Sequence, residues 1–132
     1  MRALHLQTRA QFQALLRTAP VARTSHFALH RLAHSPAGGL PADTGGMFAP
    51  AAAAWLGAMT PKRWARRAVT RNTIRRQIYA VGDGLDVPLC AGAHLVRLRA
   101  AFAPAQFPSA RSEALKRAVR AELVQLFERG RR

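Results

Sequence analysis

The basic segment from Pro61 to Ala80 restricts the folds open to this chain, because it contains seven Lys and Arg residues and no carboxylate. If Arg67 to Val81 is helical, the turn of about 100° per residue places Ile74, Ile78 and Val81 on one side. That side offers a narrow apolar edge for packing, while most of the other side chains need solvent. We therefore predict a surface helix that contacts the rest of the fold along one edge.

The outward face of this predicted helix is suited to binding phosphate. It presents a column of residues with two flanking arginines: Ala68, Asn72, Arg75 and Tyr79 in the column, and Arg71 and Arg76 beside it. Further basic residues precede the helix, namely Lys62, Arg63, Arg66 and Arg67. Guanidinium groups bind phosphate oxygens through paired hydrogen bonds, and the Asn72 amide adds a donor and an acceptor. Surface helices usually mix charge signs, so this uncompensated charge favours a polyanionic partner over a merely solvated face.

The charge of the whole chain supports the same interpretation. Lys and Arg outnumber Asp and Glu by 21 to 6, which gives a formal net charge of +15. A hydrophobic content of 49% over 132 residues suffices for one folded domain and argues against a disordered tail. Nucleic acid is therefore the first partner to consider, and an anionic membrane surface is the second.

The single cysteine, Cys90, excludes an internal disulfide and a Cys-x-x-Cys zinc spacing. No stretch approaches the roughly 18 apolar residues of a membrane span, and the first residues do not resemble a signal peptide. We therefore expect a cytoplasmic protein with no disulfide partner. Cys90 is expected to be a small buried residue, since no particular histidine is placed beside it by the sequence.

The N-terminal third predicts a helix followed by strand structure. Thr8 and Gln11 fit a capping box. Apolar residues then recur at helical spacing until Pro20, namely Phe12, Leu15 and Leu16. Residues 21 to 34 alternate instead, with Phe27 and Leu29 on one face and His26, Ala28 and His30 on the other. This pattern is typical of a half-buried strand, or of two strands.

The middle of the chain alternates between connections and short apolar runs. Ser35 to Ala54 is dominated by Gly, Pro and Ala, which predicts a long flexible surface loop where function is not expected. Trp55 to Thr60 is a short apolar run that Pro61 ends, so it suits a strand. After the basic helix, Val81 to Gly92 is a turn-rich connection.

The C-terminal third predicts one more strand and a closing helix. Ala93 to Phe102 alternates as a strand would, with Arg97 and Arg99 on the face of Leu95. The closing helix opens near Ser109 or Ser112, ends at Gly130 and carries one apolar stripe: Leu115, Val119, Leu123, Leu126 and Phe127. Together these elements predict a single-domain α+β sandwich in which helices pack on a small sheet.

The segment KRWARRAVTRNTIRRQI resembles the signature of the bacterial ribonuclease P protein component family, centred on the Arg71-Asn72 pair. RAQFQALL, HFALH and ALKRAVRAELVQLF resemble that family's first helix, aromatic strand and closing helix, so the resemblance covers nearly all of residues 1–132. It implies the order α-β-β-β-α-β-α with a small mixed sheet. It also implies a left-handed βαβ crossover, which sequence alone would not suggest because such connections are almost always right-handed.

The resemblance also implies a function. The family's protein assists a catalytic RNA that removes the 5′ leader from precursor tRNA, with Mg²⁺ held mainly by RNA and no cofactor on the protein. The residues that match the RNA-subunit contact are Lys62, Arg63, Arg66, Arg67, Arg71, Asn72, Arg75 and Arg76. Those assigned to the cleft for the precursor leader are Phe12, Leu16, Phe27, His30 and Tyr79.

The sequence departs from the family pattern at several positions. Thr73 stands where the family often has a third motif arginine, and Tyr79 occupies another basic position. Leu16 replaces a frequent aromatic, so stacking on the leader would rest on fewer rings. The basic residues before the helix number about one more than in the commonest form, and the Ser35 to Ala54 loop is longer than usual.

Other sites and functions remain open on sequence grounds. Asp83 and Asp86 could hold a magnesium ion, although two such carboxylates are more often turn formers. His30 and His34 lie in a strand pattern, so their rings need not converge on zinc. A structural RNA-binding protein such as a ribosomal component fits the composition equally well. A membrane-surface binder is less favoured, because the basic helix has few large apolar residues to insert.

Overall fold

The computed structural model describes residues 3–33, 48, 53–102 and 113–131. Eight elements follow in chain order: β1 (Leu4–His5), α1 (Arg9–Leu16), β2 (Ala22–Arg23), β3 (Phe27–Ala33), β4 (Ala54–Met59), α2 (Ala68–Asp83), β5 (Gly92–Leu98) and α3 (Glu113–Gly130). The predicted α+β order is confirmed, and the pattern over residues 21 to 34 forms two strands. The sequence did not reveal β1, which has only two residues. The predicted strand from Ala93 to Phe102 ends earlier, at Leu98.

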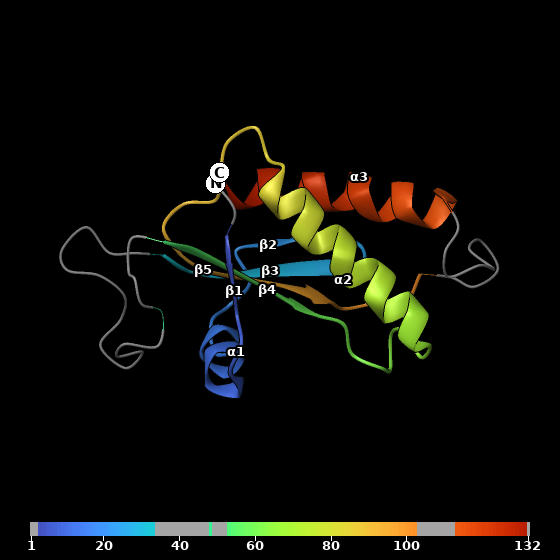
Figure 1. Ribbon diagram of the computed structural model, residues 1–132, viewed down its shortest axis with the longest axis horizontal. Helices are drawn as coiled ribbons and strands as arrows, with labels where there is room; N and C mark the ends of the chain where they lie inside the picture. Colours follow the sequence, from blue (N-terminus) through green and yellow to red (C-terminus); the bar gives the residue numbers. More distant parts are fainter. Residues whose placement is uncertain (1–2, 34–47, 49–52, 103–112, 132) are drawn as a thin grey trace.

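The strands form one mixed sheet in the order β1-β4-β5-β3-β2. β4 is parallel to both β1 and β5, whereas β3 is antiparallel to β2 and β5. Helix α2 connects the parallel neighbours β4 and β5, which makes this unit the predicted crossover. Its left-handed sense stays a prediction. Figure 1 shows α2 and α3 over one face of the sheet and α1 against the other.

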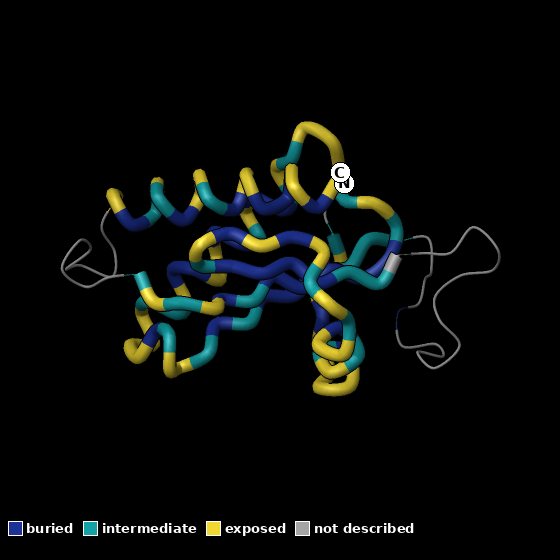
Figure 2. The backbone as a smooth tube through the Cα atoms, turned by 180° about the vertical axis from the view of Figure 1, so that it is seen from behind, coloured by how far each residue is buried: buried dark blue, intermediate teal, exposed yellow. Residues whose placement is uncertain are grey.

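Helices on both sides of the sheet create two buried clusters. The larger lies under α2 and α3 and includes Phe27, Leu29, Leu56, Ile74, Ile78, Leu98 and the whole α3 stripe. The smaller lies on the side of α1 and contains Leu6, Leu15, Phe48, Ala93 and Leu95. In Figure 2 the strands accordingly form a buried layer between helices with exposed outer turns.

This double cover corrects the expectation of a half-buried strand at β3. Phe27 and Leu29 are buried as predicted, but Ala28 and His30 on the opposite face are buried as well, with exposures of 0% and 3%. The physical reason is that α1 and the segment that follows it cover the second face. The alternation along β3 therefore separates two faces that are both packed against helices, and does not separate a buried face from a solvent-exposed one.

The helices follow their sequence patterns closely. At α1, the Gln11 backbone N–H donates to Thr8 Oγ1 (3.1 Å), and the Thr8 N–H donates to Gln11 Oε1 (3.0 Å), which is the predicted capping box. Leu15 is buried, whereas Leu16 is 39% exposed. All five stripe residues of α3 are buried and the helix ends at Gly130. Ser109 and Ser112 lie outside the described residues, as does the predicted start of this helix.

The segment from Ser35 to Ala54 is described only at residues 48, 53 and 54. Phe48 is 2% exposed and its ring meets that of Trp55 edge-on at 6.1 Å between centroids. Ala54 begins β4. The expectation of a wholly surface loop is therefore wrong at Phe48, because an aromatic ring can fill the core beside α1 even from a segment rich in Gly, Pro and Ala. Within the described part of the chain, no helix is long and apolar enough to cross a membrane.

Candidate RNA interface

Helix α2 and the turn before it present the predicted basic surface. We call residues Pro61 to Arg67 the lead-in. Most of the predicted contact residues are exposed: Lys62, Arg63, Arg66, Arg67, Asn72, Arg75 and Arg76. The first turn of α2 has no acidic residue and its N-cap, Arg67, makes no side-chain cap bond. Because a helix N-terminus carries partial positive charge, the lead-in arginines add to a positive potential that no carboxylate in the first turn of α2 offsets.

Arg71 is only half-exposed because its guanidinium group bonds within the chain. Its Nη1 donates to the backbone carbonyls of Ala65 (3.1 Å) and Arg66 (2.8 Å). Ala65 is 5% exposed and anchors the lead-in in the core. The prediction that Arg71 faces outward for phosphate therefore needs revision, since at least one of its amino groups holds the lead-in in place.

Arg75 also connects two elements. Its Nη1 donates to Asn72 Oδ1 (3.3 Å), which confirms that the two residues lie together, and its Nη2 donates to Thr60 Oγ1 (3.3 Å). Thr60 follows β4 and is 7% exposed. Arg75 thus joins α2 to the end of the neighbouring strand, while the exposed remainder of its side chain stays on the basic face.

Tyr79 is only partly exposed, unlike Asn72 and Arg75 of the predicted column, and it does not join the leader-cleft residues. Its ring stacks on His5 of β1 with centroids 3.9 Å apart, and it packs against the cluster under α2 and α3. Burial raises the pKa of Tyr79, although a backbone hydrogen bond with Ala58 and the charge of Arg75 oppose this. In the described structure Tyr79 therefore packs the edge strand β1 against α2.

A second basic group, which we call the arginine cluster, is centred on His30 and Arg97 of the α1 side of the sheet; it comprises Arg23, Arg63, Arg97, Arg99 and the imidazole of His30. His30 Nδ1 lies 2.9 Å from the Thr18 carbonyl, so this nitrogen carries the proton and donates. Its Nε2 is therefore free to accept from Arg97 Nε (3.3 Å). Burial lowers the pKa of His30 and the hydrogen bond to the Thr18 carbonyl opposes this, but the charges of Arg97 and Arg23 lower it further, so the neutral ring is favoured.

The charges in this cluster repel one another. Burial lowers the pKa of Arg97, and three neighbouring guanidinium groups lower it further: those of Arg99, Arg23 and Arg63. Within the described part of the chain, none of the ion pairs involves these four arginines. An anion placed here would relieve the repulsion. Arg63 belongs to the lead-in, so the cluster continues the basic surface of α2.

Phe12, Leu16 and His30 share the α1 side, as the predicted leader cleft requires. Phe12 is half-buried, Leu16 is exposed and His30 is buried beneath Arg97. Phe27 does not join them, because it is 0% exposed and packs in the cluster under α2 and α3. The strand alternation already separated Phe27 from His30, so assigning both to one cleft was inconsistent with their opposite orientations in β3.

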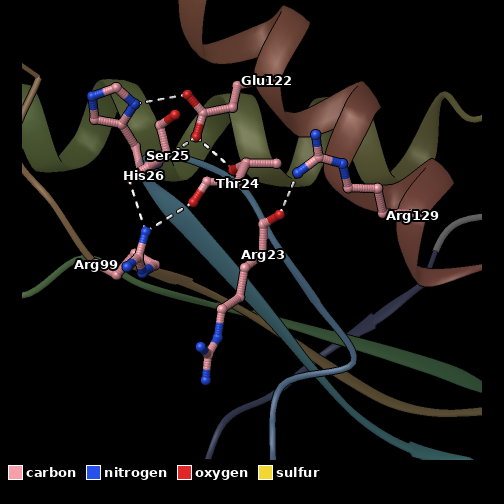
Figure 3. A network of polar contacts seen from close by, with 7 residues as sticks. All are labelled: Arg23, Thr24, Ser25, His26, Arg99, Glu122 and Arg129. Carbon is pink, nitrogen blue, oxygen red and sulfur yellow. Dashed lines mark hydrogen bonds and ion pairs between the residues drawn. The ribbon is translucent and has the colours of Figure 1, made fainter.

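A polar network fixes the β2–β3 hairpin to α3 (Figure 3). Glu122 Oε2 accepts from Thr24 Oγ1 (2.6 Å) and from the His26 backbone N–H (2.7 Å), and Oε1 lies 2.7 Å from His26 Nδ1. Arg99 Nη1 donates to the carbonyls of Thr24 and Ser25 (2.9 and 3.0 Å). Nothing in the sequence pairs these positions, which are far apart in the chain.

The network also positions part of the arginine cluster. Arg129 Nη1 donates to the Arg23 carbonyl (2.6 Å). In Figure 3 the Arg23 side chain points away from Glu122 and Arg129. The hairpin backbone is therefore held by α3 while the Arg23 guanidinium stays available to the opposite side of the sheet.

Of the remaining residues considered, Asp83, Cys90 and Trp64 have contacts within the chain, whereas His34 lies outside the described residues. Asp83 Oδ1 accepts from the Ala3 backbone N–H (3.1 Å). Over the described residues, no group of three or more His, Cys, Asp or Glu side chains is arranged for a metal ion. Cys90 is exposed, not buried as expected, and its Sγ lies 3.6 Å from Nε2 of the buried His94. Trp64 packs against the core with Arg63 over its ring at 5.2 Å, so that face is not open for base stacking.

Comparison with known proteins connects this geometry to a family. The family model described as Ribonuclease P matches residues 1–126. The ribonuclease P protein component of Ralstonia pickettii is 35% identical over 128 residues, which span 96% of this chain and 79% of that protein. The corresponding protein of Bordetella parapertussis is 34% identical over 120 residues, spanning 91% and 85%.

A solved structure confirms the fold independently of close sequence similarity. The Staphylococcus aureus RNase P protein superposes with a TM-score of 0.64 at 16% identity, covering 96% of this chain and 94% of that one. At 16% identity this match shows a shared fold only. Membership of the family is shown by the family model and by the two relatives. The chain belongs to the ribonuclease P protein family.

Proposed function

We propose that this chain binds the RNA subunit of ribonuclease P through α2 and the lead-in, and holds the 5′ leader of precursor tRNA on the arginine cluster. Ribonuclease P is an endoribonuclease ribonucleoprotein whose catalyst is RNA, and this family supplies its protein component. The observation that carries the proposal is the positive charge gathered around Arg97: none of the ion pairs among the described residues involves the cluster arginines, and one of those arginines, Arg63, belongs to the lead-in.

The RNA-subunit contact is assigned to the exposed cations of the lead-in and α2: Lys62, Arg63, Arg66, Arg67, Arg75 and Arg76. Asn72 supplies a donor and an acceptor beside Arg75. Each RNA phosphate that such a cation neutralises releases condensed counterions, so affinity should fall steeply with salt. Arg71 acts mainly by holding the lead-in, through its bonds to two backbone carbonyls.

The leader contact is assigned to the α1 side. A single strand needs cations for its phosphates and flat or apolar surfaces for its bases. Arg97 and Arg23 offer the charge there, while Phe12 and Leu16 on α1 offer the apolar surface. His30 stays neutral and orients Arg97 through their hydrogen bond. Phe27 and Tyr79 have no place in this contact.

The proposal assigns no catalytic group to the protein. Mg²⁺ is expected to act on the RNA, and the net charge of +15 would screen repulsion between catalytic RNA and substrate. The holoenzyme should therefore need less Mg²⁺ than the RNA alone. Its expected place of action is the bacterial cytoplasm, where precursor tRNA is made. Membership of the family removes the grounds for the rival prediction of a ribosomal component.

Processing at low magnesium tests the proposal. The purified chain is mixed with a bacterial ribonuclease P RNA and precursor tRNA at an Mg²⁺ concentration where the RNA alone cleaves slowly. The unsubstituted chain should stimulate cleavage. Arg66→Gln/Arg67→Gln should stimulate less, with RNA affinity about 15- to 30-fold weaker at 0.15 M salt if each arginine neutralises one phosphate. Arg117→Gln, an exposed position on α3, is the matched control. Absence of stimulation by the unsubstituted chain would refute the proposal.

A further inference from the structure

A groove between α2 and α3 carries a basic surface that the sequence did not indicate. Its volume is about 420 Å³, and its lining residues are Val69, Asn72, Thr73, Arg76, Gln77 and Lys116. None of these described lining residues is a carboxylate. Two of them, Asn72 and Arg76, belong to the α2 face assigned to RNA, so the groove continues that face toward α3.

The floor of the groove is made of small or internally bonded polar residues. Thr73 is 8% exposed and its hydroxyl donates to the Val69 carbonyl one turn earlier (2.8 Å). Gln77 is also 8% exposed, and its Oε1 accepts from Arg120 Nε (2.9 Å). A long side chain at Thr73 would project into this space, so the short threonine helps to keep the groove open.

Two cations from α3 line or border the groove. The bond to Gln77 directs Arg120 toward α2 and uses only its Nε donor, which leaves four other N–H donors on the guanidinium. Lys116 pairs with Glu113 at 3.4 Å, but the two side chains are 36% and 76% exposed. Solvent screens such a pair strongly, so Lys116 can exchange this partner for a phosphate.

We propose that the α2–α3 groove binds the phosphodiester backbone of the catalytic RNA, with Lys116 and Arg120 of α3 as contact residues beside Arg76. This proposal rests on the proposed function. Charge complementarity favours RNA as the occupant, because the groove brings cations from two helices around a polar floor. The contact would extend the RNA-binding surface from one helix to two.

The test uses the full-length chain, a bacterial ribonuclease P RNA and a series of KCl concentrations. Lys116→Gln and Lys116→Gln/Arg120→Gln are compared with Arg117→Gln, which removes one charge from an exposed position of the same helix outside the groove. Each groove substitution should reduce the magnitude of the log–log salt slope by about 0.7–0.9 and weaken binding about four- to six-fold at 0.15 M salt. Circular dichroism checks the fold, and Lys116→Gln carries the test alone if loss of the Gln77 bond perturbs the double variant.

Three results would overturn the proposal, and they differ in what else they affect. If the groove variants match Arg117→Gln while the unsubstituted chain binds RNA, the groove assignment fails and the proposed function stands. If the variants change only the preference for precursor over mature tRNA, the occupant is the leader and not the catalytic RNA. If the unsubstituted chain has no affinity for the RNA, the proposed function fails together with the groove.

Discussion

Single residues in this protein divide between those that we propose contact RNA and those that position them. Arg71 and Arg76 illustrate the division, because both lie on α2 and carry the same charge. Arg71 bonds to two lead-in carbonyls, whereas Arg76 lines the open groove. Sequence patterns predict which residues are charged, but the direction of a guanidinium depends on carbonyls that only the folded turn brings within reach.

Arg71→Ala should therefore affect both stability and RNA binding. Loss of two hydrogen bonds to a charged donor should lower the free energy of unfolding by about 1–2 kcal/mol. The log–log slope of RNA affinity against salt should fall in magnitude by more than the roughly 0.7–0.9 expected for one phosphate contact, because the lead-in arginines also lose their position. Urea unfolding and a KCl titration measure the two effects, and Arg76→Gln serves as control, with unchanged stability and a loss of one contact. A slope change of one contact or less for Arg71→Ala would contradict the positioning role.

The buried residue His94 should make the stability of the fold depend on pH. It is 1% exposed, donates from Nδ1 to the Trp55 carbonyl (3.1 Å), and burial lowers its pKa from 6.5 to about 4. Because the unfolded chain binds this proton more readily, stability is full above about pH 6.5 and is lost as the pH falls toward 4. The loss should be on the order of 2–3 kcal/mol. His94→Gln removes the titration and should flatten urea-derived stability between pH 6.5 and 4.5; an unchanged pH slope would contradict the assignment.

At the scale of elements, the structure depends on helices that cover both faces of one sheet. Helices α1 and α3 were predictable because their periodicity and capping are local, and the α3 stripe is buried throughout. The sequence did not predict β1, because two residues make no pattern. It also could not place Phe48 in the core or pair Glu122 with His26, since these contacts join distant segments.

Glu122 tests how the β2–β3 hairpin is held against α3. Glu122→Ala would leave the Thr24 hydroxyl and the His26 backbone N–H without their acceptor. Thr24 is only 7% exposed, so water cannot readily replace the carboxylate there. Burying unsatisfied donors should cost about 1–3 kcal/mol in unfolding free energy. The matched control is Glu128→Ala, whose exposed pair with Arg131 at 3.8 Å contributes little. Thermal or urea unfolding compares them, and equal stabilities would show that the hairpin is held by apolar packing alone.

At the scale of the whole molecule, the excess positive charge is spread over two connected surfaces, namely the α2 face with its lead-in and the arginine cluster. The sequence predicts the net charge of +15, the basic helix and the polyanionic partner. It does not predict that the charge of Arg63 in the lead-in helps to lower the pKa of Arg97, or that α3 brings Lys116 and Arg120 beside α2. These arrangements arise because α2 crosses from β4 to β5, which brings the lead-in to the same end of the sheet as the arginine cluster.

The most direct test of this account is the ratio of holoenzyme affinities for precursor and mature tRNA. The holoenzyme with the unsubstituted chain should bind precursor more tightly by at least about fivefold, the effect of one stacked base. With Phe12→Ala/Arg97→Gln the ratio should approach one while affinity for the catalytic RNA is retained. An unsubstituted holoenzyme that binds both tRNAs equally, or a ratio that the double substitution leaves unchanged, would contradict the assignment of the leader to the α1 side.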